Sequence, residues 1–466
     1  MSVFKRSTHT SVDKGWAWVV LAGSFVEYFI MVGILKTFGL FFVEFQRTYK
    51  TTASTLSMVF SVQTAVTSLS AVLVMGIGIK YFTERTLVVG GALFGLTSNI
   101  GSAFAPNSST LFFTQGVLFG LSTTFAHLSS TLLVGKYFER RRGMANGIIN
   151  LGGSIGGLAW PPVITYLLND YGLQGTLLIV GAVCLHLIPV GLLMRPIDLG
   201  AKEESTHSLE IATGFEEGNE HLVSPSNHDP ENCFIETESS QIEQSSEAKI
   251  ERNCCRQCSS LIFNFALFKN SSFLLLVVMS FLVSFGCVLP LTYIPPFAED
   301  RGIQRNRIGY LVTISAASDI VSRTIFIFLA DNRKVKRYHM MAIGLMGGGV
   351  VCLLANFYTT FITISVFSAL HIFLAGTYFS LINVVMVDFI GLRNLNHGLA
   401  MSTVTRGISS AVGSLSMGLI RDESGSYVGG FMWMGACLIL GGLSLLVKPF
   451  LSKRAPEQTR TSEGKL

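Results

Sequence analysis

Charged side chains are scarce in this sequence, and their scarcity excludes a soluble globular protein. Only 14% of the 466 residues are Asp, Glu, Lys or Arg, whereas soluble domains hold about 25%. Hydrophobic residues make up 49% of the chain, and the mean hydropathy is +0.51. We therefore expect a polytopic membrane protein, whose Phe and Gly content suits lipid-facing bulk and close helix packing.

Familiar enzyme and metal motifs are missing as well. The sequence has no phosphate-binding loop, no zinc-protease helix and no nucleophile elbow, so we expect no enzyme, no cofactor and no metal site. Cys255 and Cys258 have the spacing of a metal knuckle but lack a second pair. No cysteine falls in a segment that we place outside the cell, so we expect no structural disulfide. Acylation of Cys254, Cys255 or Cys258 is an alternative to unmodified thiols.

Long apolar runs dominate what is present. Residues 1–15 are polar and basic and lack the apolar core of a cleavable signal. Twelve apolar runs follow, each of a length suited to a membrane-spanning helix. They cover residues 16–43, 57–79, 86–105, 111–135, 143–168, 174–194, 270–296, 308–330, 338–357, 359–387, 396–420 and 428–450.

The distribution of charge predicts the orientation of these helices. Residues 195–269 hold 14 Asp and Glu against 6 Lys and Arg, and the rest of the chain holds 15 against 28. With the N-terminus in the cytosol, short loops and tails on that side carry nineteen Lys and Arg, against six on the other side. The basic excess is thus a topology signal and not a nucleic-acid footprint. Both termini and the loop 195–269 are predicted to be cytosolic, and the loop is predicted to be disordered.

The two halves of the chain look like copies of each other. A shift of 255 residues aligns Gly143 and Ala145 with Gly398 and Ala400. We therefore predict an all-α protein with 12 transmembrane helices in two pseudo-symmetric six-helix halves, the major facilitator fold, with a substrate site at midplane between the halves. The predicted parts are a tail 1–15, a half 16–194, the loop 195–269, a half 270–450 and a tail 451–466.

Apart from Lys448 near the end of the last run, which is counted with the cytosolic tail, five strongly ionisable residues lie inside the predicted spans. Asp319 and Arg323 are four residues apart in the run 308–330, so both lie on one helix face. The other three are Glu27, Lys36 and Arg406. If all five are ionised their charges sum to +1, and an uncompensated cation at bilayer depth is costly. This sum favours a transported monoanion.

The spacing of these charges suggests roles. Lys36 lies nine residues after Glu27, on the opposite helix face, so it needs another partner or extends to the membrane surface. Arg406 is a second candidate anion contact or a structural partner of Glu27. Protonation of Asp319 would release Arg323 to bind a carboxylate, which couples one proton to one monoanion. A purely structural Asp319–Arg323 pair is the alternative.

His127, His186 and His371 also fall within apolar runs. A single histidine in such a run is more often a buried packing residue than a proton relay. His371, with Tyr378 and Phe379 on the same predicted helix, could shape the wall of the pocket; ordinary helix packing is the alternative.

Two sequence signatures and the Asp319–Arg323 pair carry a family resemblance. The stretch from Asp13 to Trp18 resembles the opening signature of the monocarboxylate transporter family, and the stretch from Tyr137 to Gly147 resembles its second signature. The matching residues are Asp13, Gly15, Trp16, Trp18, Tyr137, Phe138, Arg140, Arg141, Gly143, Ala145 and Gly147. Lys14 departs from the family's usual glycine.

The resemblance implies a plasma-membrane symporter that carries a small monocarboxylate, such as lactate or pyruvate, together with a proton. In that family a lysine of helix 1 with an aspartate and an arginine of helix 8 form the working set, and Lys36, Asp319 and Arg323 occupy the matching places. Arg406 is outside that set. The resemblance also implies a single-span glycoprotein chaperone as a partner, beside membrane lipid.

Two other functions stay open at the level of sequence. Some relatives carry aromatic amino acids, creatine or thyroid hormone, so this protein could be a facilitator without proton coupling. The more remote alternative is a receptor-like or scaffold membrane protein that acts through its acidic cytosolic loop and does not transport.

Overall fold

Helices are the only regular elements in the part of the chain that the structure describes. The computed structural model describes residues 13–78, 81–138, 141–195, 270–330, 336–391 and 395–447. The expectations for the N-terminal residues before Asp13, for the long loop beyond Arg195 and for the C-terminal tail lie outside these ranges. So do those for Arg140, Cys254, Cys255 and Cys258.

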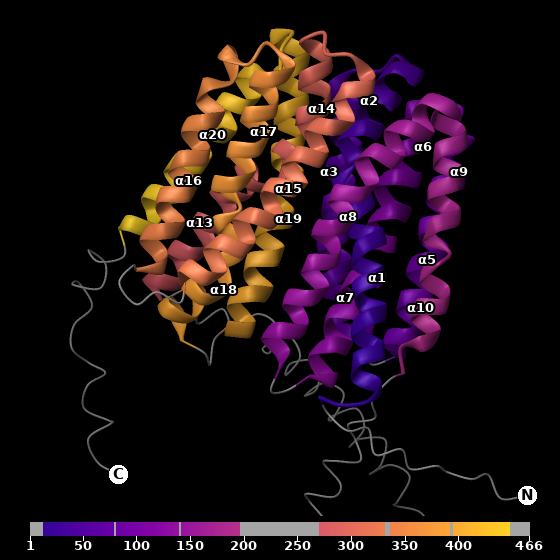
Figure 1. Cartoon of the computed structure of the whole chain (residues 1–466), viewed down its shortest axis with the longest axis vertical. Helices are drawn as coiled ribbons and strands as arrows, with labels where there is room; N and C mark the ends of the chain where they lie inside the picture. Colours follow the sequence, from indigo (N-terminus) through magenta and orange to yellow (C-terminus); the bar gives the residue numbers. More distant parts are fainter. Residues whose placement is uncertain are drawn as a thin grey trace, which may run out of the picture. The chain divides into compact units, whose positions relative to one another are not determined.

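The N-terminal half begins at Trp16 and ends at Leu193 (Figure 1). Its elements are α1 (Trp16–Lys36), α2 (Phe38–Tyr49), α3 (Ala53–Leu73), η1 (Val74–Gly78), α5 (Glu84–Ala103), α6 (Ser108–Leu111), η2 (Phe112–Leu118), α7 (Phe119–Tyr137), α8 (Arg142–Asp170), α9 (Gly172–Cys184) and α10 (Leu187–Leu193). Side-chain oxygens of Thr52, Thr83 and Asn107 cap the first turns of α3, α5 and α6 by accepting from backbone N–H groups.

The C-terminal half begins at Ser271 and ends at Leu446. Its elements are α13 (Ser271–Val288), α14 (Pro290–Asp300), α15 (Arg305–Ala330), α16 (Arg337–Leu353), η4 (Leu354–Phe357), α17 (Phe361–Ala375), α18 (Thr377–Ile390), α19 (Leu395–Ser424) and α20 (Val428–Leu446). Helices occupy all twelve predicted apolar runs, and most predicted boundaries lie within a few residues of the observed ones.

Ten segments of the described chain are long and apolar enough to cross a membrane. The remaining two long helices are α15, with 26 residues, and α19, with 30 residues. These two carry Asp319, Arg323 and Arg406, and charged or polar side chains lower their mean hydropathy. The helices with the weakest membrane signal therefore hold three of the candidate site residues.

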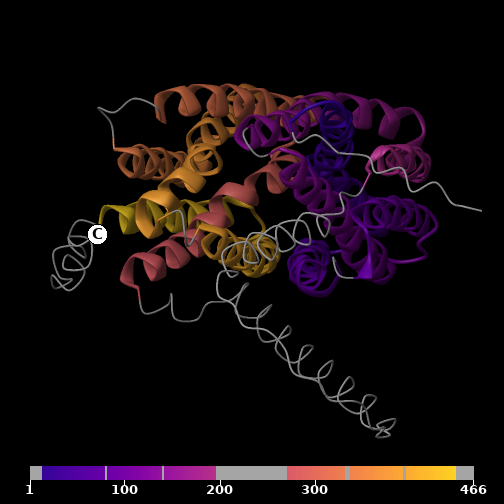
Figure 2. The same ribbon diagram turned by 90° about the horizontal axis from the view of Figure 1, so that it is seen from below.

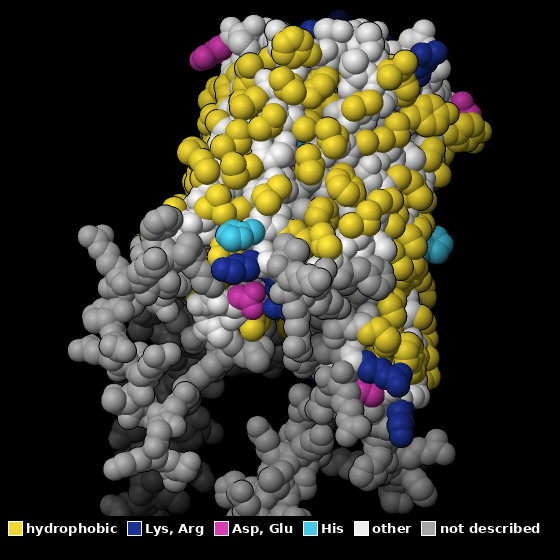
Figure 3. Space-filling model, turned by 60° about the vertical axis from the view of Figure 1, so that its left-hand side comes forward, with side chains coloured by type: hydrophobic (Ala, Val, Ile, Leu, Met, Phe, Trp, Pro, Cys, Tyr) yellow, Lys and Arg dark blue, Asp and Glu magenta, His cyan; other side chains and the backbone are white. Residues whose placement is uncertain are grey.

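Apolar side chains cover one lateral face of the C-terminal half, and charged side chains gather toward its two ends (Figure 3). Exposed apolar residues of this half include Ile343, Val350, Ile362 and Val366, which are 51–73% exposed. In water such a surface would be an aggregation hazard. It fits the hydrocarbon of a bilayer, so these observations support a multi-pass membrane protein.

Several predicted runs are broken helices. The first run divides at Thr37, whose hydroxyl donates to the Ile34 carbonyl at 2.6 Å. The run 270–296 divides at Leu289, immediately before Pro290, and the run 359–387 divides at Gly376. Pro161 and Pro162 lie inside α8 without dividing it. The run 174–194 also divides, between Cys184 and Leu187, just before Pro189. The breaks beside Pro290 and Pro189 follow from the proline positions, and those at Thr37 and Gly376 do not.

Glycines allow α1 and α8 to approach at backbone distance. A Cβ atom at Gly156 would lie 2.2 Å from the Phe29 carbonyl oxygen, and one at Gly152 would lie 2.6 Å from the Phe25 carbonyl oxygen. This close packing does not extend to Gly143 and Gly147, where a Cβ would meet nothing within 4 Å. These two glycines lie in the first turns of α8, before the helix reaches its contact with α1.

The two halves meet along three helix pairs. We call the end of the bundle that holds Trp16 and Leu446 the terminal end, and the end that holds Tyr49 and Ser424 the distal end. The pairs are α2 with α14, α3 with α19 and α8 with α15, and Figure 2 shows the halves side by side along the bundle axis. Candidate site residues on α15 and α19 thus lie on helices that contact the other half.

Candidate functional site

Asp319 is the centre of an ion-pair cluster that joins the two halves. Its Oδ2 lies 2.9 Å from Lys36 Nζ of α1, and its Oδ1 accepts a hydrogen bond from Arg323 Nε at 2.9 Å. The Ser154 hydroxyl of α8 also donates to Oδ2, at 3.3 Å. The Asp319 side chain is 10% exposed. One buried carboxylate therefore binds two cations, one from each half.

Arg323 keeps part of its hydrogen-bonding capacity free. Only its Nε bonds to Asp319, and the two terminal amino groups have no hydrogen-bond partner among the described residues. The guanidinium carbon lies 5.5 Å from the centre of the Phe379 ring of α18, a cation–π distance. With 27% of its side chain exposed, Arg323 can offer two parallel N–H groups to an arriving carboxylate.

Lys36 reaches Asp319 because a glycine leaves room for its stem. A Cβ atom at Gly157 of α8 would lie 2.6 Å from Lys36 Cδ. Lys36 is also the last residue of α1, immediately before the break at Thr37. It does not extend to the membrane surface, which was one of its two predicted placements. The alternative, a partner other than Glu27, is what the structure contains.

Glu27 lies in the interior without a partner. Its residue exposure is 0%, and neither carboxyl oxygen forms a hydrogen bond of ordinary geometry, although the Ser130 hydroxyl of α7 lies nearby. It forms no ion pair with Arg406, so of the two alternatives for Arg406 the structural pairing with Glu27 is wrong. An ionised carboxyl at this depth without a partner is costly, which favours the neutral acid. The ionised set is then Lys36, Arg323 and Arg406 against Asp319.

Arg406 and His127 lie apart from the Asp319 cluster. Arg406 of α19 is half-buried and has no hydrogen-bond or ion-pair partner among the described residues. His127 of α7 is exposed, and its ring stacks on Tyr28 at 4.3 Å. His371 differs, because it is fully buried and its Nε2 lies 2.9 Å from the Gly286 carbonyl oxygen. His371 therefore packs between helices.

The two signatures contact each other at the terminal end. The Asp13 backbone N–H donates to the Tyr137 carbonyl oxygen at 3.0 Å, and the rings of Trp18 and Phe138 meet edge to face at 5.8 Å. Trp16 donates through its indole N–H to the Leu193 carbonyl oxygen. The residues with positive φ in this turn are Asp13, at 63°, and Gly15, at 58°. The first signature thus fixes the start of α1 against α7 and α10.

The second signature has a buried and an exposed side. Tyr137, Phe138 and Ala145 are at most 1% exposed, whereas Arg141 and Gly143 are exposed. The buried residues explain how the motif holds α7 to its neighbours. The exposed arginine is placed at the end of the bundle, where lipid headgroups would lie.

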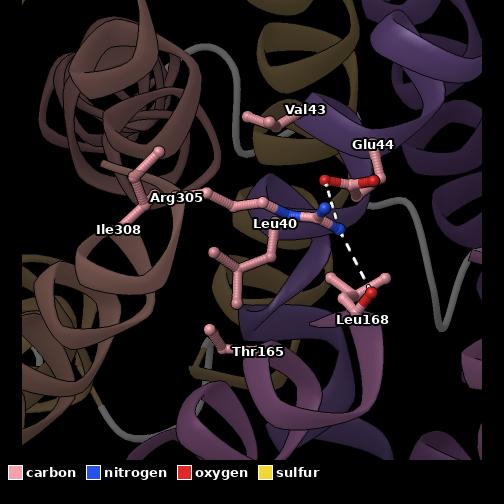
Figure 4. A pocket seen from close by; sticks show the side chains of 7 residues that line it. All are labelled: Leu40, Val43, Glu44, Thr165, Leu168, Arg305 and Ile308. Carbon is pink, nitrogen blue, oxygen red and sulfur yellow. Dashed lines mark hydrogen bonds and ion pairs between the residues drawn. The ribbon is translucent and has the colours of Figure 1, made fainter. Parts of the chain in front are cut away.

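At the distal end, polar contacts join the halves. Arg305 of α15 forms an ion pair with Glu44 of α2 at 2.7 Å and donates to the Leu168 carbonyl oxygen at 3.3 Å (Figure 4). Asp422 of α19 accepts from the backbone N–H groups of Ala53 and Ser54 at the start of α3, at 3.1 Å and 2.9 Å. The sequence contained no pattern that would pair these residues.

Comparison with known proteins settles the family. The family model described as Major Facilitator Superfamily matches residues 23–304 and 274–466. The chain belongs to the major facilitator superfamily. It is a membrane transporter protein by descent, with the two-halved helical fold that the sequence predicted.

Within the superfamily, the chain is similar to proteins named monocarboxylate transporters. It is 28% identical to monocarboxylate transporter 12 of Xenopus laevis, over 98% of this chain and 95% of that protein. It is 25% identical to monocarboxylate transporter 1 of Bos taurus, over 98% of this chain and 89% of that protein. The resemblance carried by the two signatures is thereby confirmed.

Solved transporter structures share the fold. A peptide transporter of the POT family in complex with sulfate superposes with a TM-score of 0.68 at 12% sequence identity, over 95% of this chain and 97% of that one. A POT family transporter in complex with 5-aminolevulinic acid gives a TM-score of 0.65 at 13% identity, over 94% of this chain and 96% of that one. At such identities the likeness concerns the fold alone.

Proposed function

We propose that this protein carries small monocarboxylates, such as lactate or pyruvate, together with a proton, by alternating access. The observation that carries the proposal is the Asp319 carboxylate, which lies 2.9 Å from a cation of each half, Lys36 and Arg323. A proton acceptor and two anion-binding groups in one cluster provide what proton–anion symport requires. The similarity to monocarboxylate transporters supports the same substrate class.

The proposed coupling follows from charge balance. While Asp319 is ionised, it neutralises part of the charge of Lys36 and Arg323. A proton on Asp319 leaves both cations without their counter-ion, and a substrate carboxylate then takes its place on the free amino groups of Arg323 and on Lys36. One positive and one negative charge enter together, so transport is electroneutral. Separation of Lys36 from Asp319 would also loosen the junction between the halves.

Arg406 contributes a further cation to the proposed substrate pathway. With Glu27 neutral, three cations lie in the spans against one carboxylate. This surplus attracts an organic anion more strongly than the surplus of one predicted when Glu27 is counted as ionised. Lys36 and Arg323 bind the carboxylate in our proposal, and Arg406 is a second anion contact.

We place the protein in the plasma membrane with both termini in the cytosol. The positive-inside rule supports this orientation, which puts the distal end and its Glu44–Arg305 contact outside the cell. Arg141 would then face the anionic lipids of the cytosolic leaflet. A single-span glycoprotein chaperone is a proposed partner on the strength of the family resemblance.

The test is radiolabelled lactate and pyruvate uptake into cells or vesicles, with and without an inward proton gradient. We expect acid-stimulated uptake in the wild type and its loss in Asp319→Asn, with surface expression retained. Asp300→Asn is the matched control, because Asp300 is an ion-paired carboxylate at the distal end, bonded to Arg421 at 2.6 Å. It should keep acid-stimulated uptake.

The outcomes separate the candidate functions. Unchanged acid-stimulated uptake in Asp319→Asn would refute the proposed role of this carboxylate. Wild-type uptake that does not depend on the proton gradient would instead indicate a facilitator, and its substrate would be sought among aromatic amino acids, creatine and thyroid hormone. No uptake of any of these, with a phenotype that depends on the loop 195–269, would favour the scaffold function.

A further inference from the structure

Arg406 of α19 and His127 of α7 flank the same stretch of α3, and together with Tyr28 of α1 they form a second polar site. Gly407, next to Arg406, packs against Ser68 of α3, and Ser70 of α3 donates to Thr124 of α7, one turn before His127, at 3.0 Å. The His127 ring stacks on Tyr28 of α1, with centroids 4.3 Å apart and planes tilted by 31°. The Tyr28 hydroxyl is bonded to Thr131 Oγ1 at 2.6 Å, which fixes the ring that supports His127.

The polar groups of this site are available to a ligand. Arg406 has no hydrogen-bond or ion-pair partner in the described part of the chain, and neither ring nitrogen of His127 has one there. Among the residues of α7, which are all described, only His127 is exposed. The most accessible side chain of this helix is therefore an imidazole without a hydrogen bond among the described residues.

Arg406 points away from lipid. The exposed apolar residues Ile408, Val412 and Leu419 mark the outer face of α19, with exposures of 55%, 47% and 45%. Arg406 precedes Ile408 by two residues, which is about 200° of rotation on an α-helix. The Arg406 side chain therefore leaves α19 on the side opposite this lipid-facing stripe, one position before Gly407, which approaches Ser68 of α3.

We infer that Arg406 and His127 bind the far end of the transported anion, and that the preferred substrate is an elongated carboxylate with a second hydrogen-bond acceptor remote from its carboxylate. Tyr28 precedes Lys36 by eight residues on α1, an axial offset of about 12 Å. The side chains of Lys36 and Arg406 can each cover several ångströms of that offset. Lactate is too short to reach Arg406 and His127 and would contact Lys36 and Arg323 only. This inference rests on the proposed function, in which Lys36 and Arg323 bind the carboxylate.

A competition experiment tests the inference in cells that express the full chain. Acid-stimulated uptake of radiolabelled lactate is measured against four unlabelled acids: hexanoate, 5-oxohexanoate, octanoate and 7-oxooctanoate. Each pair differs by one carbonyl acceptor near the far end, and the two chain lengths place that acceptor at two distances from the carboxylate. We expect at least one oxo acid to inhibit at about tenfold lower concentration than its parent, as one hydrogen bond to a charged group provides.

Variants locate the preference. Arg406→Gln should abolish the advantage of the oxo acid, Arg406→Lys should keep part of it, and His127→Phe, which preserves stacking on Tyr28, should reduce it. Arg421→Gln, which removes a cation from the distal end of the same helix, should leave it unchanged. Surface biotinylation identifies a variant that fails to fold. If Arg406→Gln fails to fold, His127→Phe and Arg406→Lys decide whether the oxo-acid preference depends on this site.

Two results would overturn the inference. One is equal inhibition within both pairs in the wild type, including no inhibition by any of the four acids. The other is an oxo-acid preference that survives in Arg406→Gln and His127→Phe. If acid-stimulated lactate uptake is itself absent, or persists in Asp319→Asn, the proposed function fails, and not only the inference about Arg406 and His127.

Discussion

Replacing Arg305 by glutamine should open the distal end of the transporter. The Arg305 guanidinium joins Glu44 of α2 at 2.7 Å and the Leu168 carbonyl oxygen of α8 at 3.3 Å, so its loss removes two contacts between the halves. The Glu44 side chain is only 8% exposed and would lose its ion-pair partner. Removal of the cation therefore penalises the state in which the distal end is closed.

The size of the effect follows from the exposure of the two groups. A hydrogen bond to a charged group contributes about 1.5–3 kcal/mol. Because 37% of the Arg305 side chain is exposed, solvent screening reduces this to roughly 1–1.5 kcal/mol. That free energy corresponds to about a five- to twelvefold shift in the ratio of distal-open to distal-closed molecules. Arg305→Lys keeps the charge but not the fork, and should shift the ratio less.

Cysteine accessibility measures this shift. Thr165 lines the same pocket as Arg305 and Glu44 (Figure 4), and the four described native cysteines are buried. A membrane-impermeant maleimide applied to intact cells should label Thr165→Cys about five to twelve times faster when Arg305→Gln is also present. Equal labelling rates in the two backgrounds would refute the idea that this ion pair holds the distal end closed.

Three further predictions concern separate parts of the bundle. Glu27→Gln should keep proton-coupled uptake, since the neutral acid is replaced by a neutral isostere; a loss of acid stimulation would mean that Glu27 ionises during transport. Gly152→Ala should lower the stability of the detergent-solubilised protein by about 1–3 kcal/mol through overpacking, whereas Gly147→Ala, with nothing within 4 Å, should not; thermal unfolding of both variants compares them. Burial acts to raise the pKa of Asp422, but hydrogen bonds from α3 outweigh it and leave that pKa below its usual value. The hydrogen bonds to ionised Asp422 therefore stabilise the closed distal end at pH values above the ordinary aspartate pKa, and this stabilisation is lost only as the pH falls through the lowered pKa. Asp422→Asn should thus raise the labelling of Thr165→Cys equally at pH 6 and 7.5.

Much of the fold could be predicted because lipid imposes a simple rule on sequence. A spanning segment must be long, apolar and helical, so the twelve runs marked the helices even where charges weakened the signal. The division into halves followed from the repeat that aligns Gly143 and Ala145 with Gly398 and Ala400. The breaks at Thr37 and Gly376 could not be predicted, because neither position carries a proline and tertiary contacts decide where a helix yields.

The candidate site could be predicted only in part. The spacing of Asp319 and Arg323 fixed their local contact, since residues four apart share a helix face. No local pattern relates Lys36 to Asp319, which are 283 residues apart, and the family resemblance alone grouped them. Ser154 and the stacking of His127 on Tyr28 carried no signal in the sequence, because such contacts arise only when separate helices pack.

Simultaneous measurement of proton and substrate movement in proteoliposomes tests the account most directly. Purified protein is reconstituted with a pH-sensitive dye inside the vesicles, and labelled lactate is added outside at a set membrane potential. We expect one proton to enter for each lactate, at a rate that does not depend on the potential, and we expect both movements to stop in Asp319→Asn. Lactate entry without internal acidification, or entry at a rate that depends on the membrane potential, would contradict the claim that Asp319 binds a proton and releases Lys36 and Arg323 to the substrate carboxylate.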